Sequence, residues 1–505
     1  MRLTLKNVAG WGMVPLASIA TIVTLGAASD MRLIEAVKTG NKQAVAALLK
    51  QRVDVNTPQG DGATALHWAV HRDDLATTDL LLRAGARANA ANDLGITPLF
   101  LACTNRNGAM VEKLLSAGAN ANAASERGQT VLMECSRSGN LRGVRSLLAH
   151  GADVNAKETM HGQTALMWAV AQQHPDVVAT LIELNADVKA RSRIYAQTVT
   201  GEQTQRAGRE ELNYIAHRGG SSPLLFAARV GDVESAKLLL AAGADVNDLL
   251  PDGTSALVEA AYSGNGAVAA LLLDKGADPN AAGIGYTALH AAVLRGDLDL
   301  VKALLAHGAN PNPIVTKGTP IRRDSQDLVL AKTEISATPY FLAAKFLEPK
   351  LMAILAAGGA DPRMALADGT TPLMVAAGMG ETFNPADPGK NQTRRGLFVY
   401  DGGILEPESL VLETVTAALT LGSDVNAVNR AGDTAVHAAA ALGLDTVIQL
   451  LADKGADINV KNKRGLTPLA ALNGRGRPAV SSDGYSTRVA HPTTAALLAK
   501  LGGTE

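Results

Sequence analysis

The chain has 505 residues, of which 47% are hydrophobic and only 3% aromatic. A single hydrophobic core stops growing at roughly 250–300 residues, so this length predicts either several domains or an array of small units without a central core. Lys and Arg together number 47, and Asp and Glu together number 48. This balance provides no net field to attract nucleic acid or an anionic membrane, so we expect no nucleic-acid partner.

The first 28 residues differ from the rest of the chain. Arg2 and Lys6 precede an acid-free apolar run over residues 8–28, which ends in Gly26-Ala27-Ala28. A basic start, an apolar stretch and a small-residue end are typical of a signal peptide. We therefore expect residues 1–28 to be removed on export, which makes the mature protein periplasmic or extracellular if its source is bacterial. The alternative is an uncleaved membrane anchor, because the run is long enough to span a bilayer.

A short motif led by Thr or Ser then recurs along the chain, at intervals of 33 or 34 residues in its first copies. The first copies read TALHWAV from Thr64, TPLFLAC from Thr97, TVLMECS from Thr130 and TALMWAV from Thr164. Later copies begin at Ser222, Ser255, Thr287, Thr338, Thr371, Thr434 and Thr467. A fixed period of this length is typical of repeat proteins.

The stretch from Tyr286 to Asn312 shows what one unit encodes. Gly285 can take the positive φ of a turn, and Thr287 can cap the first helix. Gly296 breaks the first helix, and Gly308 ends the second. One such helix pair cannot bury its apolar face alone, so the pattern predicts that each unit packs against the next.

The repeated motif resembles the ankyrin repeat, which has about 33 residues with T-P-L-H-x-A at its first helix. This resemblance implies an all-α solenoid of about 12 helix-turn-helix units, with β-hairpin fingers and four insertions. The first unit, from about Asp30 to Gly60, lacks the Thr-led opening and resembles an end cap. The blocks of repeats are expected at residues 30–191, 220–312, 337–380 and 407–501.

Four segments interrupt the period. Residues 192–219 and 313–336 follow a second helix, so they should lengthen the finger between two units. Residues 381–406 and 473–492 fall between the two helices of one unit, at the opposite end of the layer. Long insertions are often functional and otherwise often disordered, and both interpretations stay open for these four.

The sequence contains no recognisable catalytic set. His67, His290 and His437 occupy the fourth place of the motif, where the resemblance implies a structural hydrogen-bonding role. The other histidines lack zinc-ligand spacing, and the chain has no Gly-rich phosphate loop, G-x-S-x-G or H-E-x-x-H. We therefore expect no enzyme activity, no catalytic residues, no metal and no cofactor.

Cys103 and Cys135 occupy the seventh and sixth places of two successive motifs. Packed helices lie roughly 8–10 Å apart, whereas a disulfide needs Cα atoms within about 7 Å. This comparison predicts two free, buried thiols and no disulfide.

The resemblance also implies a function, because ankyrin arrays bind macromolecules through a concave groove. We expect a monomeric, non-enzymatic scaffold or adaptor that binds a protein partner through the groove and the extended fingers. The alternatives are a membrane-anchored structural array and an enzyme or small-ligand carrier built from the insertions. An aromatic residue at the fifth motif place is either a packing residue or a partner anchor. The candidate contact residues are Trp68, His71, Arg72, Asn105, Arg137, Trp168, Gln172, Phe226, Arg229 and Tyr262.

Overall fold

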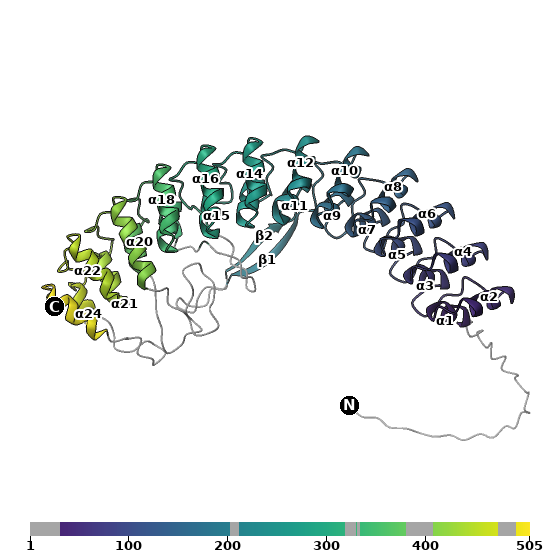
Figure 1. The fold of residues 1–505 in the computed structure, drawn as a ribbon, viewed down its shortest axis with the longest axis horizontal. Coiled ribbons are helices and arrows are strands. Elements are labelled where there is room, and N and C mark those ends of the chain that lie inside the picture. Colours follow the sequence, from purple (N-terminus) through teal and green to yellow (C-terminus); the bar gives the residue numbers. More distant parts are fainter. Residues whose placement is uncertain (1–30, 202–211, 319–329, 331–333, 380–407, 473–490) are drawn as a thin grey trace, which may run out of the picture.

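The computed structural model describes residues 31–201, 212–318, 330, 334–379, 408–472 and 491–505. Within them, twelve pairs of helices follow one another along a curved arc, with an inner and an outer row (Figure 1). This arrangement confirms the predicted all-α solenoid. The expected signal peptide, residues 1–28, lies outside the described residues, as do large parts of the four insertions. No helix in the described ranges is long and apolar enough to cross a bilayer.

The inner row consists of the first helix of each unit. Each complete motif places its Thr or Ser at the N-cap of this helix, where the hydroxyl can satisfy a free backbone N–H. Proline occupies the first helical turn of several of them, where no N–H partner is lost. The inner helices are α1 (Arg32–Lys38), α3 (Ala65–His71), α5 (Pro98–Thr104), α7 (Val131–Ser138), α9 (Ala165–Ala171), α11 (Pro223–Val230), α13 (Ala256–Tyr262), α15 (Ala288–Arg295), α17 (Pro339–Lys345), α19 (Pro372–Ala376), α21 (Ala435–Leu442) and α23 (Pro468–Leu472).

The outer row consists of the second helices, which pack behind the inner ones and on their own neighbours. The buried residues of both rows form one hydrophobic cluster that runs from Leu33 to Leu498. The outer helices are α2 (Lys42–Lys50), α4 (Leu75–Arg83), α6 (Gly108–Ser116), α8 (Leu141–Ala149), α10 (Pro175–Glu183), α12 (Val233–Ala241), α14 (Gly266–Asp274), α16 (Leu298–Ala306), α18 (Pro349–Ala357), α20 (Glu408–Thr420), α22 (Asp445–Asp453) and α24 (Pro492–Lys500).

The unit formed by α15 and α16 has the local structure that its sequence predicts. Gly285 has φ +106°, and a Cβ at this position would lie 2.5 Å from the Cβ of Lys317. Only glycine therefore fits this turn. Thr287 caps α15, and Gly296 ends it with φ +71°. Gly308, just beyond the C-cap of α16, has φ +83°.

Fingers connect each outer helix to the next inner helix. The first insertion contains a two-stranded antiparallel sheet, in which β1 (Tyr195–Gly201) pairs with β2 (Leu212–Arg218) in a register from Tyr195↔Arg218 to Gly201↔Leu212. This hairpin projects from the finger after α10 toward the concave side of the arc (Figure 1). The insertion at 381–406 falls between α19 and α20, within one unit.

A ladder of asparagines joins neighbouring units just after most of the outer helices. Asn56 donates from Nδ2 to the Gly85 carbonyl at 3.1 Å, and its Oδ1 accepts the Arg87 N–H at 2.8 Å. The same pair of bonds is made by Asn89, Asn122, Asn155, Asn280, Asn312, Asn426 and Asn459.

The ladder has two gaps. Lys189 in the fifth unit and Arg363 in the ninth occupy the asparagine position, and neither makes an equivalent bond within the described residues. Neither side chain carries an acceptor, so neither can take the backbone N–H that asparagine accepts. Asn247 stands between the two gaps, and its Oδ1 accepts the Asp278 N–H at 2.8 Å.

Candidate protein-binding face

The concave face begins with an aromatic and basic cluster on α1 and α3. Trp68 is half-buried, and its Nε1 donates to Oε1 of Gln59 at 3.1 Å. The Lys38 ammonium lies 4.7 Å from the centre of the Trp68 ring, and the exposed His71 ring meets that ring edge-on at 5.6 Å. The tryptophan is thus held in place by neighbours while part of its surface stays open.

Two of the predicted contact residues also connect units. Arg72 donates from Nη1 to the Lys38 carbonyl at 2.8 Å, and Asn105 donates from Nδ2 to the Val70 carbonyl at 2.8 Å. Each side chain therefore satisfies a carbonyl near the C-terminal end of the preceding inner helix, where no intrahelical donor remains. Both residues have a structural role, which limits how much of their surface a partner can use.

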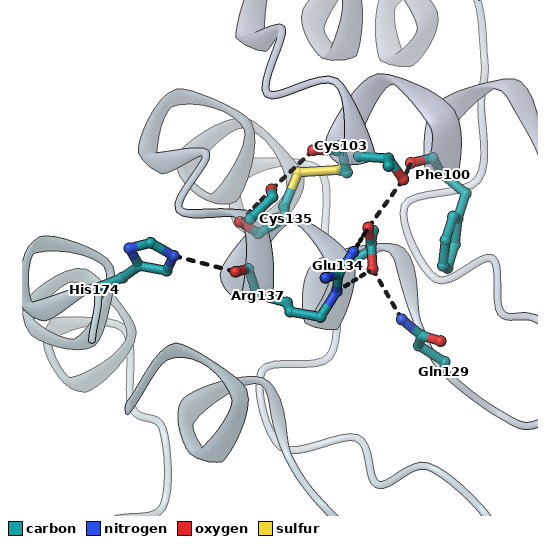
Figure 2. Close-up of polar contacts among 9 residues, drawn as sticks. Phe100, Cys103, Gln129, Glu134, Cys135, Arg137 and His174 are labelled. Atoms are coloured by element: carbon teal, nitrogen blue, oxygen red, sulfur yellow. Dashed lines mark hydrogen bonds and ion pairs between the residues drawn. A yellow bond between two sulfur atoms is a disulfide. The ribbon is translucent and has the colours of Figure 1, made fainter. Parts of the chain in front are cut away.

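Glu134 is the centre of a polar network on α5 and α7 (Figure 2). Its side chain is only 2% exposed, and its two oxygens accept bonds from Thr104, Gln129 and Arg137. The Arg137 guanidinium donates from Nε at 2.9 Å and from Nη2 at 2.5 Å. These bonds to Glu134 raise the pKa of Arg137 and fix the position of its guanidinium. Arg137 is thus oriented by a buried carboxylate.

The prediction that Cys103 and Cys135 are free is wrong. The structure joins them in a disulfide between α5 and α7, with their Cα atoms 4.5 Å apart (Figure 2). General helix spacing overestimated the separation, because other units mostly carry alanine or valine at these two motif places and small residues let neighbouring inner helices approach. Gly143 also leaves room, since a Cβ there would lie 2.7 Å from the Cys135 sulfur.

A second acidic residue orients an arginine farther along the face. Arg229 on α11 donates from Nε to Oε1 of Glu259 on α13 at 2.6 Å, and its guanidinium lies 5.8 Å from the Phe226 ring. Phe226 is half-buried and Arg229 is exposed. The pair again combines a fixed ring with a positioned positive charge.

Tyr262 continues this row on α13. Its half-buried ring lies 5.6 Å from the Arg295 guanidinium and 6.2 Å from the ring of Tyr286. Arg295 also donates from Nε to the Tyr262 carbonyl at 2.6 Å. Burial raises the pKa of the Tyr286 hydroxyl well above its usual range, so this ring stays neutral.

Trp168 and Gln172 lie on and just after α9, between these clusters. Trp168 is half-buried, and its Nε1 is shielded from solvent with no acceptor among the described residues. The equivalent Trp68 donates to Gln59, but Thr159 occupies the corresponding position before Trp168. Gln172 is exposed. All ten predicted contact residues are therefore on or directly after inner helices.

The three motif histidines have the expected structural role. In His67, Nδ1 accepts the Thr64 N–H at 3.1 Å, so Nε2 carries the proton that it donates to the Ile96 carbonyl at 3.0 Å. His290 and His437 make the same bonds within their units and to the next finger. Burial lowers the pKa of all three, and it lowers that of His290 to about 4.

Sequence reasoning missed Glu134 and Glu259. Both occupy the fifth motif place, which was singled out only where it holds an aromatic residue. The available signal was an arginine at the eighth motif place. Arg137 has this place in the same unit as Glu134, and Arg229 has it in the unit before Glu259. No group of three or more His, Cys, Asp or Glu side chains that could hold a metal ion occurs in the described part of the chain.

The sequence of this chain matches models of a known repeat family. A family model for three-copy ankyrin repeats matches residues 33–125, 108–192 and 224–315, and a single-repeat model matches residues 431–463. An ankyrin repeat-containing protein of Treponema pallidum (strain Nichols) is 51% identical over 94 residues, which is 18% of this chain and 32% of the relative. This chain thus spans about a third of that relative's length.

A structure of the human ASB11 ankyrin repeat domain has 29% sequence identity and a TM-score of 0.39, and the match covers 49% of this chain and 98% of that one. The family models together match more than half of the chain, in the blocks where the structure places successive helix pairs. Ankyrin repeats in general mediate protein–protein interactions and are not enzymes. The chain belongs to the ankyrin repeat family.

Proposed function

We propose that this protein is a non-enzymatic scaffold or adaptor, which binds a protein partner through its concave groove and fingers. The observation that carries the proposal is a set of half-buried aromatic residues on four inner helices, α3, α9, α11 and α13. Three of them, Trp68, Phe226 and Tyr262, have a cation close to the ring. Trp, Tyr and Arg are the residue types that most often dominate binding energy at protein interfaces.

Fixed side chains strengthen this proposal. Glu134 and Glu259 hold Arg137 and Arg229 in place, so a partner would not have to order these flexible side chains on binding. An immobilised long side chain costs about 0.5–1.5 kcal/mol, and preorganisation removes that cost. The arginines can therefore contribute more to affinity than free surface arginines would.

The test compares two variants in the native host. The groove variant carries Trp68→Ala, His71→Ala, Gln172→Ala and Phe226→Ala. It leaves unchanged the unit-connecting Arg72 and Asn105 and the Glu134-bound Arg137. The matched control carries Leu80→Ala, Arg145→Ala and Leu184→Ala on or beside the outer helices, where these side chains are exposed. Circular dichroism and thermal denaturation establish that both variants fold.

Crosslinking and affinity capture then identify what each protein holds. The proposal expects one partner protein that is captured by wild type and by the control but lost from the groove variant. Equal capture by the groove variant would move the binding site away from the inner helices. Capture of no protein by wild type would contradict a scaffold function.

Export is part of the same proposal. Residues 1–28 have the pattern of a signal peptide, and the buried Cys103–Cys135 disulfide supports an oxidising compartment, because disulfides are rare in the reducing cytosol. N-terminal sequencing of the protein from its host is expected to begin near Ser29. Intact Met1 together with free thiols in that material would contradict export.

A further inference from the structure

Most of the large exposed apolar side chains in the described part of the chain belong to fingers. The described residues include eleven large apolar side chains that are exposed, and eight of them belong to fingers. The other three, Leu75, Leu80 and Leu184, belong to or adjoin α4 and α10. A surface that served only as a solvated edge would not collect such residues on one side.

The densest part of this edge lies where the hairpin joins the array. Met160 is 49% exposed, Ile194 is 52% exposed and Tyr195 is 39% exposed. Backbone bonds connect the finger tips here, because the Thr159 N–H donates to the Arg127 carbonyl at 3.0 Å and the Arg193 N–H donates to the His161 carbonyl at 2.6 Å. The His161 ring meets the Tyr195 ring at 6.1 Å. These residues therefore form one continuous strip across successive fingers.

Positive charge borders the strip. Arg127 is exposed and has no side-chain partner within the described residues, while Arg193 donates from Nη1 only to the neutral Thr159 carbonyl at 3.2 Å. Arg218 faces Tyr195 across the hairpin and donates to the neutral amide of Gln197. None of these three arginines is paired with a carboxylate in the described part of the chain.

The neighbouring acids offset only part of this charge. Glu158 is buried, and its carboxylate accepts the N–H groups of Met160, His161 and Gln163 at 2.6–3.0 Å. Its charge is therefore directed inward. The exposed Glu126 lies beside Arg127, and Asp252 lies on the next finger beyond the hairpin. The strip is thus basic between these two acids.

We propose that the strip formed by Arg127, Met160, Arg193, Ile194, Tyr195 and Arg218, named the fingertip strip, binds an extended acidic segment of a partner protein that also carries aliphatic or aromatic side chains. Carboxylates of the segment pair with the arginines, and its apolar side chains cover Met160, Ile194 and Tyr195. An extended segment fits because β1 and β2 pair only with each other among the described residues. The outer edge of each strand can therefore form backbone hydrogen bonds with a further strand.

This inference rests on the proposed protein-binding function and adds the chemistry of the partner. The probe is a short fluorescein-labelled peptide in which Asp alternates with Leu and Phe. Two control peptides replace Asp by Lys, or Leu and Phe by Ser. Fluorescence anisotropy with the full-length mature protein measures the dissociation constant of each peptide.

Three proteins are compared: wild type, a fingertip variant with Arg127→Gln, Arg193→Gln and Ile194→Ser, and an outer variant with Arg145→Gln and Leu184→Ser. Wild type and the outer variant are expected to bind the Asp peptide equally, whereas the fingertip variant binds it roughly tenfold more weakly, as two lost exposed ion pairs and one lost apolar contact imply. Binding should also weaken as salt increases. The two control peptides should bind more weakly than the Asp peptide.

Equal binding of the Lys peptide, an equal loss in the outer variant, or no binding of the Asp peptide would each overturn the fingertip strip as an acidic-segment site. The capture experiment with the groove variant separates this failure from failure of the proposed function. If a partner still depends on the inner helices while the Asp peptide does not bind, the scaffold function stands and the assigned partner chemistry is wrong.

Discussion

Replacing His290 by Gln will change how the stability of α15 depends on pH. His290 is fully buried, its Nδ1 accepts the Thr287 N–H at 3.2 Å, and its Nε2 bonds the Ala337 carbonyl at 3.3 Å. Protonation would place the ring's second proton on Nδ1, the nitrogen that accepts the Thr287 N–H. The folded unit therefore favours the neutral ring.

The sign and size of the effect follow from the pKa shift. Burial lowers the pKa of His290 from 6.5 to about 4, so the unfolded chain takes up the proton first as pH falls. The neutral His290 ring therefore contributes its full stabilisation above the pKa that His290 has in the unfolded chain. This contribution is lost as pH decreases toward the pKa of His290 in the folded chain. Between about pH 7 and pH 5 the linkage relation gives a loss of about 2 kcal/mol from this one site.

Hydrogen exchange of peptides that cover α15, corrected for intrinsic rates, measures the local free energy of opening at the two pH values. On acidification, the free energy of opening should fall by about 2 kcal/mol more in wild type than in the His290→Gln variant. At neutral pH the variant's free energy of opening should already be roughly 1–2 kcal/mol lower, because glutamine makes poorer hydrogen bonds at this site. His150→Gln, at an exposed outer position, serves as the control and should behave as wild type. An equal pH-dependent loss in wild type and in His290→Gln would refute the reasoning.

Three further predictions concern contacts between units. Replacing Cys103 and Cys135 by Ser should lower the free energy of unfolding by about 3–4 kcal/mol, as the loop-entropy relation gives for their sequence separation of 32, and thermal denaturation should then no longer respond to a reductant. Glu134→Gln should lower the free energy of unfolding, measured by chemical denaturation, by about 1–2 kcal/mol. This value is discounted for solvent screening because the Arg137 side chain is 41% exposed. Unchanged stability would contradict the network around Glu134. Lys189→Asn should raise the free energy of unfolding by about 1 kcal/mol, because it closes one gap in the asparagine ladder. The measurement is hydrogen exchange, which should become slower at the amides of residues 243–245. Unchanged exchange would argue against the gap.

The features that a single unit encodes could be predicted from the sequence. Thr287, Gly285 and His290 act within one short segment or on the finger next to it, and the Thr or Ser opening recurs in every copy of the motif. The helix pairs, their caps and the structural histidines were therefore predictable. The hairpin in the first insertion also followed from its place after an outer helix.

Contacts between units were harder to predict, because they depend on how closely and in what register neighbouring helices pack. The Cys103–Cys135 disulfide forms because small residues bring α5 and α7 together, and a general helix spacing could not give that distance. The sequence of its own unit does not show that Glu134 is buried. Its burial results from partners that the preceding unit and the finger before α7 supply.

The two gaps in the asparagine ladder have a consequence for how the array comes apart. Each unit touches only its neighbours, so the cooperativity of unfolding depends on the coupling at every junction. The junctions at Lys189 and Arg363 lack the paired asparagine bonds, and they divide the twelve units into runs of five, four and three. A tensile load on the two ends of the chain is therefore expected to open these two junctions first, so that the force–extension curve shows two early releases before the runs themselves unfold.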